Sequence, residues 1–337
     1  MKALELAEFG IDHLREITLD DPQPGTGQVL VKFEAASVNY RDFMIAEGMF
    51  APPEDLPIIP LSDGAGEVVA VGQGVSALQA GDRITTLFFP RWLSGDALGD
   101  ERSVSTGLEA PGCLRDLGAI DETAVVKVAG HLSAEEAACF PCAGLTAWSA
   151  LVTTSGVSAG DTVCVLGTGG VSIFALQFAK ALGATVIVTS GSDDKLERAK
   201  ELGADHGINY KTTPEWGAAA KELTDGRGVD VVVEIGGTGT LPQSFKAIRR
   251  GGHIPIIGAL AGAQMDLAVY ELIMTNAHLH GIGVGNRACY EDMMSCVDEH
   301  QIVPVIDRVY SFDEAATALR DIDKGEHFGK LVVRIQA

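Results

Sequence analysis

From residue 162 onward, short runs of β-branched and apolar residues alternate with amphipathic segments at a regular spacing. The amphipathic segments, such as SIFALQFAKALG and DKLERAKELG, each close on a glycine, which is typical of a helix C-cap. Strands alternating with helices of this length predict a parallel, doubly wound sheet of six strands, which binds nucleotides where the strand order reverses. The predicted strands are TVCVLG (162–167), ATVIVTS (184–190), HGINY (206–210), VDVVVEIG (229–236), GHIPIIG (252–258) and HLHGIGVG (278–285).

The first 125 residues follow a different pattern. Strand-like runs such as GQVLVKFEAASV (27–38) and GAGEVVAVGQGV (64–75) are separated by glycine and proline, with little sign of long helices. Many short strands with such turns predict an all-β, barrel-like domain. The tail VYSFDEAATALRDIDKGEHFGKLVVRI (309–335) predicts one helix and one last strand, which can return to the first domain.

The segment VCVLGTGGVS follows a predicted strand and opens a predicted helix, which is the context of a dinucleotide-binding loop. Gly167 can make the tight turn, and Gly169 lets a pyrophosphate approach the N–H groups at the helix N-terminus. Ser172 replaces the third glycine of the fingerprint. We therefore predict a nicotinamide cofactor on this loop. Its predicted contacts are Gly167, Thr168, Gly169, Gly170 and Val171.

The end of the second predicted strand bears on the choice of cofactor. NAD-specific sites place an acidic residue about 20 residues after the glycine loop to hold the ribose 2′-hydroxyl. Here the strand ends in TSGSDDK, so that Ser190 and Ser192 stand at that place and Lys195 is near. Asp193 and Asp194 fit the first turn of a helix better than the ribose site. The pattern favours NADP(H) over NAD(H).

Composition and charge exclude several classes of function. The chain has 337 residues, enough for two domains. Its 25 basic and 46 acidic residues give a formal charge of −21, which repels phosphate backbones and anionic lipids. The sequence contains neither an apolar run of about eighteen residues nor a signal-peptide pattern. We expect a cytoplasmic protein that binds neither nucleic acid nor membrane.

The cysteines do not suggest a disulfide scaffold, because apart from one close pair they lie far apart in the chain, and most should be buried free thiols. Cys139 and Cys142 form a C-x-x-C in AACFPCAGLTAW. This pair precedes the nucleotide-binding strand in an apparent helix, unlike a thioredoxin-type redox pair, and the second pair of a zinc knuckle is missing. We interpret Cys139 as a packing residue. The six are Cys113, Cys139, Cys142, Cys164, Cys289 and Cys296.

From end to end the chain resembles the medium-chain dehydrogenase/reductase superfamily. The matching pieces include GAGEVVAVG (64–72), CAGLTAWSAL (142–151), LGTGGVS, AKELGAD (199–205) and HFGKLVVRI (327–335), in family order. The resemblance implies a GroES-like catalytic domain, residues 1–127 completed by 286–337, around a Rossmann domain at 128–285. It implies hydride transfer in an interdomain cleft and a homodimer or homotetramer. It also implies that Gly236, Gly237, Gly258 and Val284 line the cofactor, with Lys330 near it.

The same resemblance locates where zinc members hold their metal. The first cysteine ligand is replaced in AASVNYRDFM, where Asn39 stands, and the Gly-His-Glu triplet is replaced in PLSDGAG by Ser62 and Asp63. Only Cys142 remains, and one thiolate cannot hold a catalytic zinc. Cys113 stands alone where zinc members keep a structural zinc lobe. We predict no metal, and expect Cys142 to be a neutral thiol beside the nicotinamide, with Thr146 close by.

Without a metal, a hydrogen-bond donor must stabilise the negative charge that hydride transfer builds on oxygen. Tyr40 is the first candidate and Asn39 the second, because VNYRD resembles the segment from which quinone and enoyl reductases place polar groups near the nicotinamide. Alternatively, Asn39 is simply a helix N-cap. At the place of Phe50 some relatives carry a tyrosine, so a tyrosine acid there is not available.

Two further groups of residues have open roles. Phe88, Phe89 and Trp92 can shape a substrate pocket or form the core of a loop. His278 and His280 should share one face of a strand, and without a visible third ligand we interpret them as structural.

These observations predict an NADPH-dependent, zinc-independent oxidoreductase that transfers hydride to a quinone or an α,β-unsaturated carbonyl. The alternatives are a zinc-free NAD(P)-dependent alcohol or aldehyde dehydrogenase and, more distantly, a non-catalytic member of the family.

Overall fold

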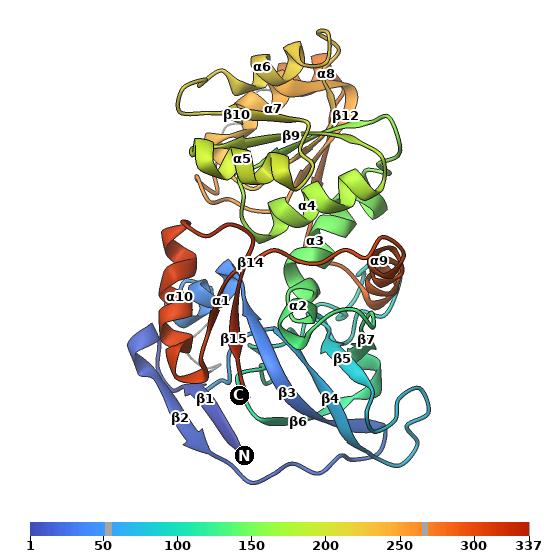
Figure 1. Cartoon of the computed structure of the whole chain (residues 1–337), viewed down its shortest axis with the longest axis vertical. Helices are drawn as coiled ribbons and strands as arrows, with labels where there is room; N and C mark the ends of the chain where they lie inside the picture. Colours follow the sequence, from blue (N-terminus) through green and yellow to red (C-terminus); the bar gives the residue numbers. More distant parts are fainter. Residues whose placement is uncertain (51–55, 265–268, 337) are drawn as a thin grey trace. The chain divides into compact units, whose positions relative to one another are not determined.

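The computed structural model describes residues 1–50, 56–264 and 269–336 (Figure 1). The chain forms two compact units. The first contains Met1–Leu145 and Gly285–Ala337, and the second contains Thr146–Val284.

The first unit is built on a β-sheet with the strand order β14-β15-β3-β4-β5-β7, in which β6 also pairs with β3. Alternate residues of β3, among them Val29, Val31 and Phe33, are fully buried, as expected for a strand with one face on a core. The strands are β3 (Gln28–Val38), β4 (Asp63–Val71), β5 (Arg83–Thr86), β6 (Leu117–Asp121), β7 (Val125–Lys127), β14 (Ile306–Tyr310) and β15 (Lys330–Arg334), beside a separate pair β1 (Lys2–Leu6) and β2 (Leu14–Thr18). The predicted β-rich domain is confirmed.

The C-terminal tail returns to this sheet. After β14 the chain forms α10 (Ala315–Lys324), which ends at Gly325 in the left-handed conformation, and then β15. β15 pairs antiparallel with β3, so that Leu331 lies opposite Val38. The last strand therefore places Lys330 beside the end of β3. The unit also contains α1 (Tyr40–Ala46) and α9 (Arg287–Glu299), and the short helices η1 (Ile11–His13), η3 (Glu122–Ala124) and η7 (Phe312–Glu314).

One continuous helical stretch covers Ala134–Thr154, and it is long and apolar enough to cross a membrane by length and composition alone. Because 78% of its most apolar window is buried, it fits a core helix of this fold. Its first part, α2 (Ala134–Ala137), packs against β3, β4 and β15. The first unit therefore continues through Leu145, whereas our prediction ended this part of the domain at residue 127. The following turns are η4 (Phe140–Gly144), α3 (Leu145–Trp148) and η5 (Ser149–Thr154), of which η4 and η5 are π-helical.

The second unit contains the predicted parallel sheet of six strands, and its strand order is β10-β9-β8-β11-β12-β13. Its central strands are completely buried because helices cover both faces of such a sheet. The strands are β8 (Thr162–Leu166), β9 (Thr185–Ser190), β10 (His206–Asn209), β11 (Val229–Val233), β12 (Ile248–Ile256) and β13 (His278–Gly281). The helices are α4 (Gly170–Ala181), α5 (Asp193–Glu201), α6 (Trp216–Glu222), η6 (Gly237–Gly239), α7 (Leu241–Ala247) and α8 (Val269–Thr275).

Candidate active site

A group of polar side chains, which we call the buried cluster, lies where β3 ends and β4 and β15 begin. Asn39 is the N-cap of α1, and its backbone N–H donates to Asp42 Oδ2 at 2.9 Å. Lys330 Nζ donates to Asn39 Oδ1 at 2.6 Å and to the Val38 carbonyl at 2.9 Å. Both side chains are almost completely buried, at 8% exposure for Asn39 and 3% for Lys330. The buried cluster consists of Asn39, Arg41, Asp42, Ser62, Asp63 and Lys330.

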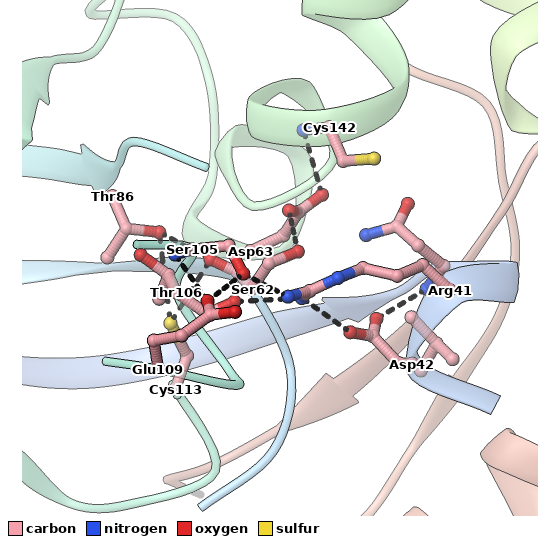
Figure 2. Close-up of polar contacts among 12 residues, drawn as sticks. Arg41, Asp42, Ser62, Asp63, Thr86, Ser105, Thr106, Glu109, Cys113 and Cys142 are labelled. Carbon is pink, nitrogen blue, oxygen red and sulfur yellow. Dashed lines mark hydrogen bonds and ion pairs between the residues drawn. The ribbon is translucent and has the colours of Figure 1, made fainter. Parts of the chain in front are cut away.

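Asp63 is enclosed by hydrogen bonds (Figure 2). Ser62 Oγ donates to Asp63 Oδ1 at 2.6 Å, and the backbone N–H of Cys142 donates to Asp63 Oδ2 at 3.1 Å. Ser62 and Asp63 are fully buried. Burial raises the pKa of Asp63, and the charge of Lys330 is the largest of the opposing influences, which also include the Asn39 amide. The structure thus brings together Asn39, Asp63 and Cys142, which stand at the positions where zinc-binding members hold their metal.

Asp42 is the second buried acid. Burial raises its pKa to about 6, and the nearby Arg41 opposes this shift most strongly. Arg41 Nη1 lies 3.8 Å from Asp42 Oδ1. The guanidinium also donates to the Thr106 carbonyl at 2.9 Å and to Ser105 Oγ. The buried cluster therefore contains two acids, Asp42 and Asp63, and two cations, Arg41 and Lys330.

The segment that supports Arg41 comes from the loop after β5. Ser105 Oγ donates to Glu109 Oε2 at 2.6 Å, and the Arg41 guanidinium lies 4.7 Å from the centre of the Phe88 ring. Phe88 and Phe89 are buried and pack edge to face with their centroids 4.7 Å apart. Trp92 lies near Phe89, with 6.3 Å between the ring centroids. These contacts favour the interpretation that Phe88, Phe89 and Trp92 form the core of a loop over the alternative that they shape a substrate pocket.

Three cysteines surround the buried cluster. Figure 2 shows the Cys142 thiol pointing away from Asp63, although its backbone N–H points toward it. Burial raises the pKa of the Cys142 thiol, which keeps it neutral as expected. Cys113 lies 3.6 Å from the Ser62 carbonyl, and Cys139 donates to the Glu135 carbonyl. None of the six cysteines forms a disulfide, and Cys139 is fully buried, in line with a packing role.

In the second unit, the predicted cofactor residues lie at the carboxyl ends of the parallel strands. Gly167 follows β8 with φ of +75°, a conformation that favours glycine, and Gly169 is the N-cap of α4. Ser172 donates through Oγ to the Leu166 carbonyl at 2.7 Å, so its hydroxyl is turned inward where the usual motif has glycine. Thr168, Gly170 and Val171 belong to this same strand-to-helix turn. Such a turn can bind a pyrophosphate.

The next strand end lacks a ribose-binding acid. Ser190 is buried at the end of β9. Ser192 is the N-cap of α5, and the Oγ of Ser192 accepts a hydrogen bond from the backbone N–H of Lys195. Asp193 instead accepts from Asn209 Nδ2 at 2.7 Å.

Tyr210 and Lys211 lie against Gly191. A Cβ atom at Gly191 would come within 2.7 Å of the Tyr210 hydroxyl and 2.8 Å of Lys211 Cε. Our sequence reasoning missed both residues. They could have been found from their position in the sequence, because they directly follow β10, the strand that pairs with β9.

The turn after β11 is organised by the buried Glu234. Its Oε1 accepts from the N–H groups of Gly236 and Gly237 at 2.7 and 3.1 Å, and Thr240 and Ser244 also donate to this carboxylate. Gly258 follows β12, and Val284 follows β13 in the left-handed region with φ of +61°. Of the other predicted cofactor residues, Thr146 is buried at the start of the second unit, and Cys142 and Lys330 belong to the first.

Comparisons with known proteins decide the family. An alcohol dehydrogenase GroES-like domain matches residues 25–136, and a zinc-binding dehydrogenase domain matches residues 170–299. A zinc-type alcohol dehydrogenase-like protein of Schizosaccharomyces pombe is 41% identical over 97% of this chain and 96% of its own length. The chain belongs to the medium-chain dehydrogenase/reductase superfamily. The family resemblance and the predicted fold are confirmed, and the chain is an oxidoreductase of this superfamily.

Other members of the superfamily are also similar over their full length. A chloroplast envelope quinone oxidoreductase homologue of Arabidopsis thaliana is 32% identical over 99% of this chain and 98% of its own. The crystal structure of a candidate alcohol dehydrogenase of Sinorhizobium meliloti has a TM-score of 0.92 at 40% identity, covering 99% and 98% of the two chains. A mycobacterial protein complexed with NADPH has a TM-score of 0.82 at 27% identity, covering 99% and 100%.

Zinc is implied by the names of several superfamily members, but the residues of the buried cluster do not fit it. Asn39 Oδ1 faces an ammonium group, and both oxygens of Asp63 already accept hydrogen bonds. Over the described parts of the chain, no three His, Cys, Asp or Glu side chains converge as a metal site would require.

Tyr40 and the histidines complete the account of the predicted residues. Tyr40 is the first residue of α1, 37% exposed, with its ring 5.6 Å from that of Phe43. His278 and His280 do share one face of β13, and His253 of β12 joins them. His253 stacks on His278 at 4.9 Å, and His253 Nδ1 is 3.1 Å from His280 Nε2. The sequence did not reveal this third histidine, because strand pairing brings it close.

Proposed function

We propose that this superfamily member is an NADPH-dependent, zinc-independent reductase that transfers hydride to a quinone or an α,β-unsaturated carbonyl. One observation carries the proposal: the place of the metal ligands is taken by the hydrogen-bonded buried cluster. Its two cations, Arg41 and Lys330, already stand beside Asp42 and Asn39, so an added Zn²⁺ would bring a further double positive charge into a buried site. The similarity to a quinone oxidoreductase homologue supports the same substrate class.

The preference for NADPH is supported by the end of β9. Ser190 and Ser192 replace the acid that would repel a 2′-phosphate, and Lys195, Tyr210 and Lys211 provide cations and a hydroxyl around it. The similarity to a protein complexed with NADPH points the same way.

The chain's own residues would bind and orient the reactants. When bound, the cofactor supplies the hydride, and solvent supplies the proton that completes reduction of the substrate. A donor must stabilise the negative charge on the substrate oxygen meanwhile. We place Asn39 first because its Nδ2 is buried and has no hydrogen-bond partner among the described residues. Tyr40, the first candidate at the sequence level, becomes the second because it lies exposed on α1.

The test is NADPH consumption by the purified full chain against panels of quinones, enones, aldehydes and alcohols. We expect turnover with quinones or enones, and little with NADH. Turnover confined to saturated alcohol–aldehyde pairs would instead establish the alternative, a zinc-free alcohol dehydrogenase. Several relatives are named alcohol dehydrogenases. Calorimetric failure to bind any dinucleotide would favour a non-catalytic member.

Elemental analysis should find far less than one zinc per chain, and chelators should leave turnover intact.

We also propose that the chain forms a homodimer or homotetramer. The support is a patch of exposed apolar side chains on α8, beside the sheet that ends in the edge strand β13. These residues are Val269, Tyr270, Ile273 and Met274, all more than half exposed. Light scattering should give at least twice the mass of 35.3 kDa, and Tyr270→Glu should lower it.

A further inference from the structure

We propose that Lys330 is a positioning residue that fixes the orientation of the Asn39 amide, so that Nδ2 is presented as the donor to a substrate oxygen. The inference rests on the proposed reductase function and adds to it the group that orients the donor. A lysine ammonium has donors and no acceptor, so the amide atom at 2.6 Å from Nζ must be the oxygen. If the amide turned over, its NH₂ group would face the ammonium. Lys330 therefore excludes the opposite orientation.

The lysine is itself held in place by the sheet. Its Nζ also donates to the Val38 carbonyl at 2.9 Å, and its backbone N–H donates to the Val305 carbonyl at 2.9 Å. Leu331, the next residue, lies opposite Val38 in the antiparallel pairing of β15 with β3. Since Lys330 is only 3% exposed, its side chain has little freedom to move. A fixed donor of this kind needs no reorganisation when charge develops.

The other end of the amide faces Asp63 and lies buried without a hydrogen bond among the described residues. Asn39 is more than nine-tenths buried, and its Nδ2 has no hydrogen-bond partner among the described residues, although the amide faces Asp63 and lowers the pKa of that carboxyl. Buried donors are nearly always paired in folded proteins. A ligand oxygen, such as the carbonyl of a quinone or an enone, would provide the missing acceptor.

The charge of Lys330 also makes Asn39 a better donor. A cation at Oδ1 draws electron density through the conjugated amide, which strengthens the N–H as a donor to an anion, and the buried setting weakens the screening of that charge. The same ammonium lowers the pKa of Asp63 and of Asp42, which keeps the buried cluster balanced. We infer that Lys330 acts through Asn39 and does not touch the substrate.

The proposal is tested with Lys330→Met, Asn39→Ala and the double variant, with the best substrate of the panel. We expect Lys330→Met to lower kcat about 10²-fold, the typical effect of losing one oxyanion donor, with little change in KM for NADPH. In the Asn39→Ala background, Lys330→Met should cost less than about threefold more, because the two residues act as a unit. Lys330→Arg should restore most of kcat, since its guanidinium can donate to Oδ1. Lys127→Met, which removes an exposed lysine paired with Asp82, is the matched control and should keep wild-type kcat. Additive losses in the double variant would overturn the proposal.

A second measurement does not depend on turnover. In protein labelled with ¹⁵N-asparagine, the side-chain resonances of Asn39 are those that disappear in Asn39→Ala. Lys330→Met should shift them and accelerate their hydrogen exchange, whereas Lys127→Met should not. Unchanged resonances would refute the positioning role even if kcat fell. If no substrate of the panel is reduced, the proposed function fails, and this measurement still decides whether Lys330 orients Asn39.

Discussion

Asp42→Asn should change how the stability of this protein depends on pH. Burial raises the pKa of Asp42 from its ordinary value of 3.8 to about 6 in the folded state. The carboxyl is therefore protonated more readily when folded than when unfolded. Its contribution to stability is complete below pH 3.8 and is lost as the pH rises through about 6. The amide that replaces the carboxyl in the variant cannot ionise, but its oxygen can still accept the Asn39 N–H that Asp42 accepts at 2.9 Å.

The magnitude follows from the difference of about 2.2 pH units, which corresponds to about 3 kcal/mol at 1.36 kcal/mol per unit. Between pH 4.5 and 8, linkage predicts that about 2 kcal/mol of this is lost from the wild type. The attraction between Arg41 and the ionised Asp42 is already contained in this pKa of about 6, because it opposes the effect of burial. The quantity to measure is therefore the change with pH in the stability difference between the two proteins.

The assay is urea unfolding of wild type and variant at several pH values, with the aspartate carboxyl ¹³C resonances followed in parallel. We expect the stability difference to move by about 2 kcal/mol in favour of Asp42→Asn from pH 4.5 to 8. The resonance missing from the variant should titrate near pH 6. Asp82→Asn is the control, because its hydrogen bond to Lys127 lowers the pKa of Asp82 below 3.8, so its stability difference should stay nearly constant between pH 4.5 and 8. A stability difference that stays constant, with a resonance titrating near pH 4, would refute the reasoning.

Three other perturbations test the second unit. The double variant Lys211→Ala/Tyr210→Phe should raise KM for NADPH at least about tenfold, because charge-assisted hydrogen bonds would contribute most to binding the 2′-phosphate. KM for NADH should stay unchanged, and an equal rise for both cofactors would contradict a 2′-phosphate site. Glu234→Gln replaces an acceptor of four hydrogen bonds, so it should lower the free energy of unfolding by about 2–3 kcal/mol and weaken NADPH binding, as calorimetry and denaturation would show. Burial and neighbouring histidines lower the pKa of His253 and His280, so both side chains favour the neutral form in the folded protein. The stability of the protein should therefore fall as the pH drops below about 6.5. Thermal unfolding between pH 7 and 5 should show a smaller fall for His280→Asn than for the wild type.

Much of this fold follows from local patterns in the sequence. The β-branched runs from residue 162 predicted six parallel strands because both faces of such strands are buried, although β12 begins earlier and β13 ends sooner than the runs suggested. The N-cap role of Asn39 was one of two open interpretations. The structure shows Asn39 as the N-cap of α1, with its backbone N–H donating to Asp42 and its Nδ2 buried without a hydrogen-bond partner among the described residues. The two interpretations were therefore compatible.

Other parts of the site depend on contacts that no local pattern reveals. Asn39 and Lys330 are 291 residues apart, and only the pairing of β15 with β3 makes them neighbours. Tyr210 and Lys211 follow a strand whose place beside β9 is a matter of topology. The compact units divide after Leu145 and not at the predicted residue 127, and the apolar pattern of the helical stretch 134–154 has no break that marks this point.

The return of the last strand has a consequence for the order of synthesis. Thr146–Val284 is a continuous segment, so the nucleotide-binding unit can fold while the ribosome is still translating the remainder. The first unit cannot be completed then, because β15 takes its place between β14 and β3. Until Lys330 emerges, Asp42 has Arg41 beside it, but Asp63 lacks the cation that most opposes the rise of its pKa. A nascent or truncated chain could thus fold its nucleotide-binding unit before the buried cluster is complete.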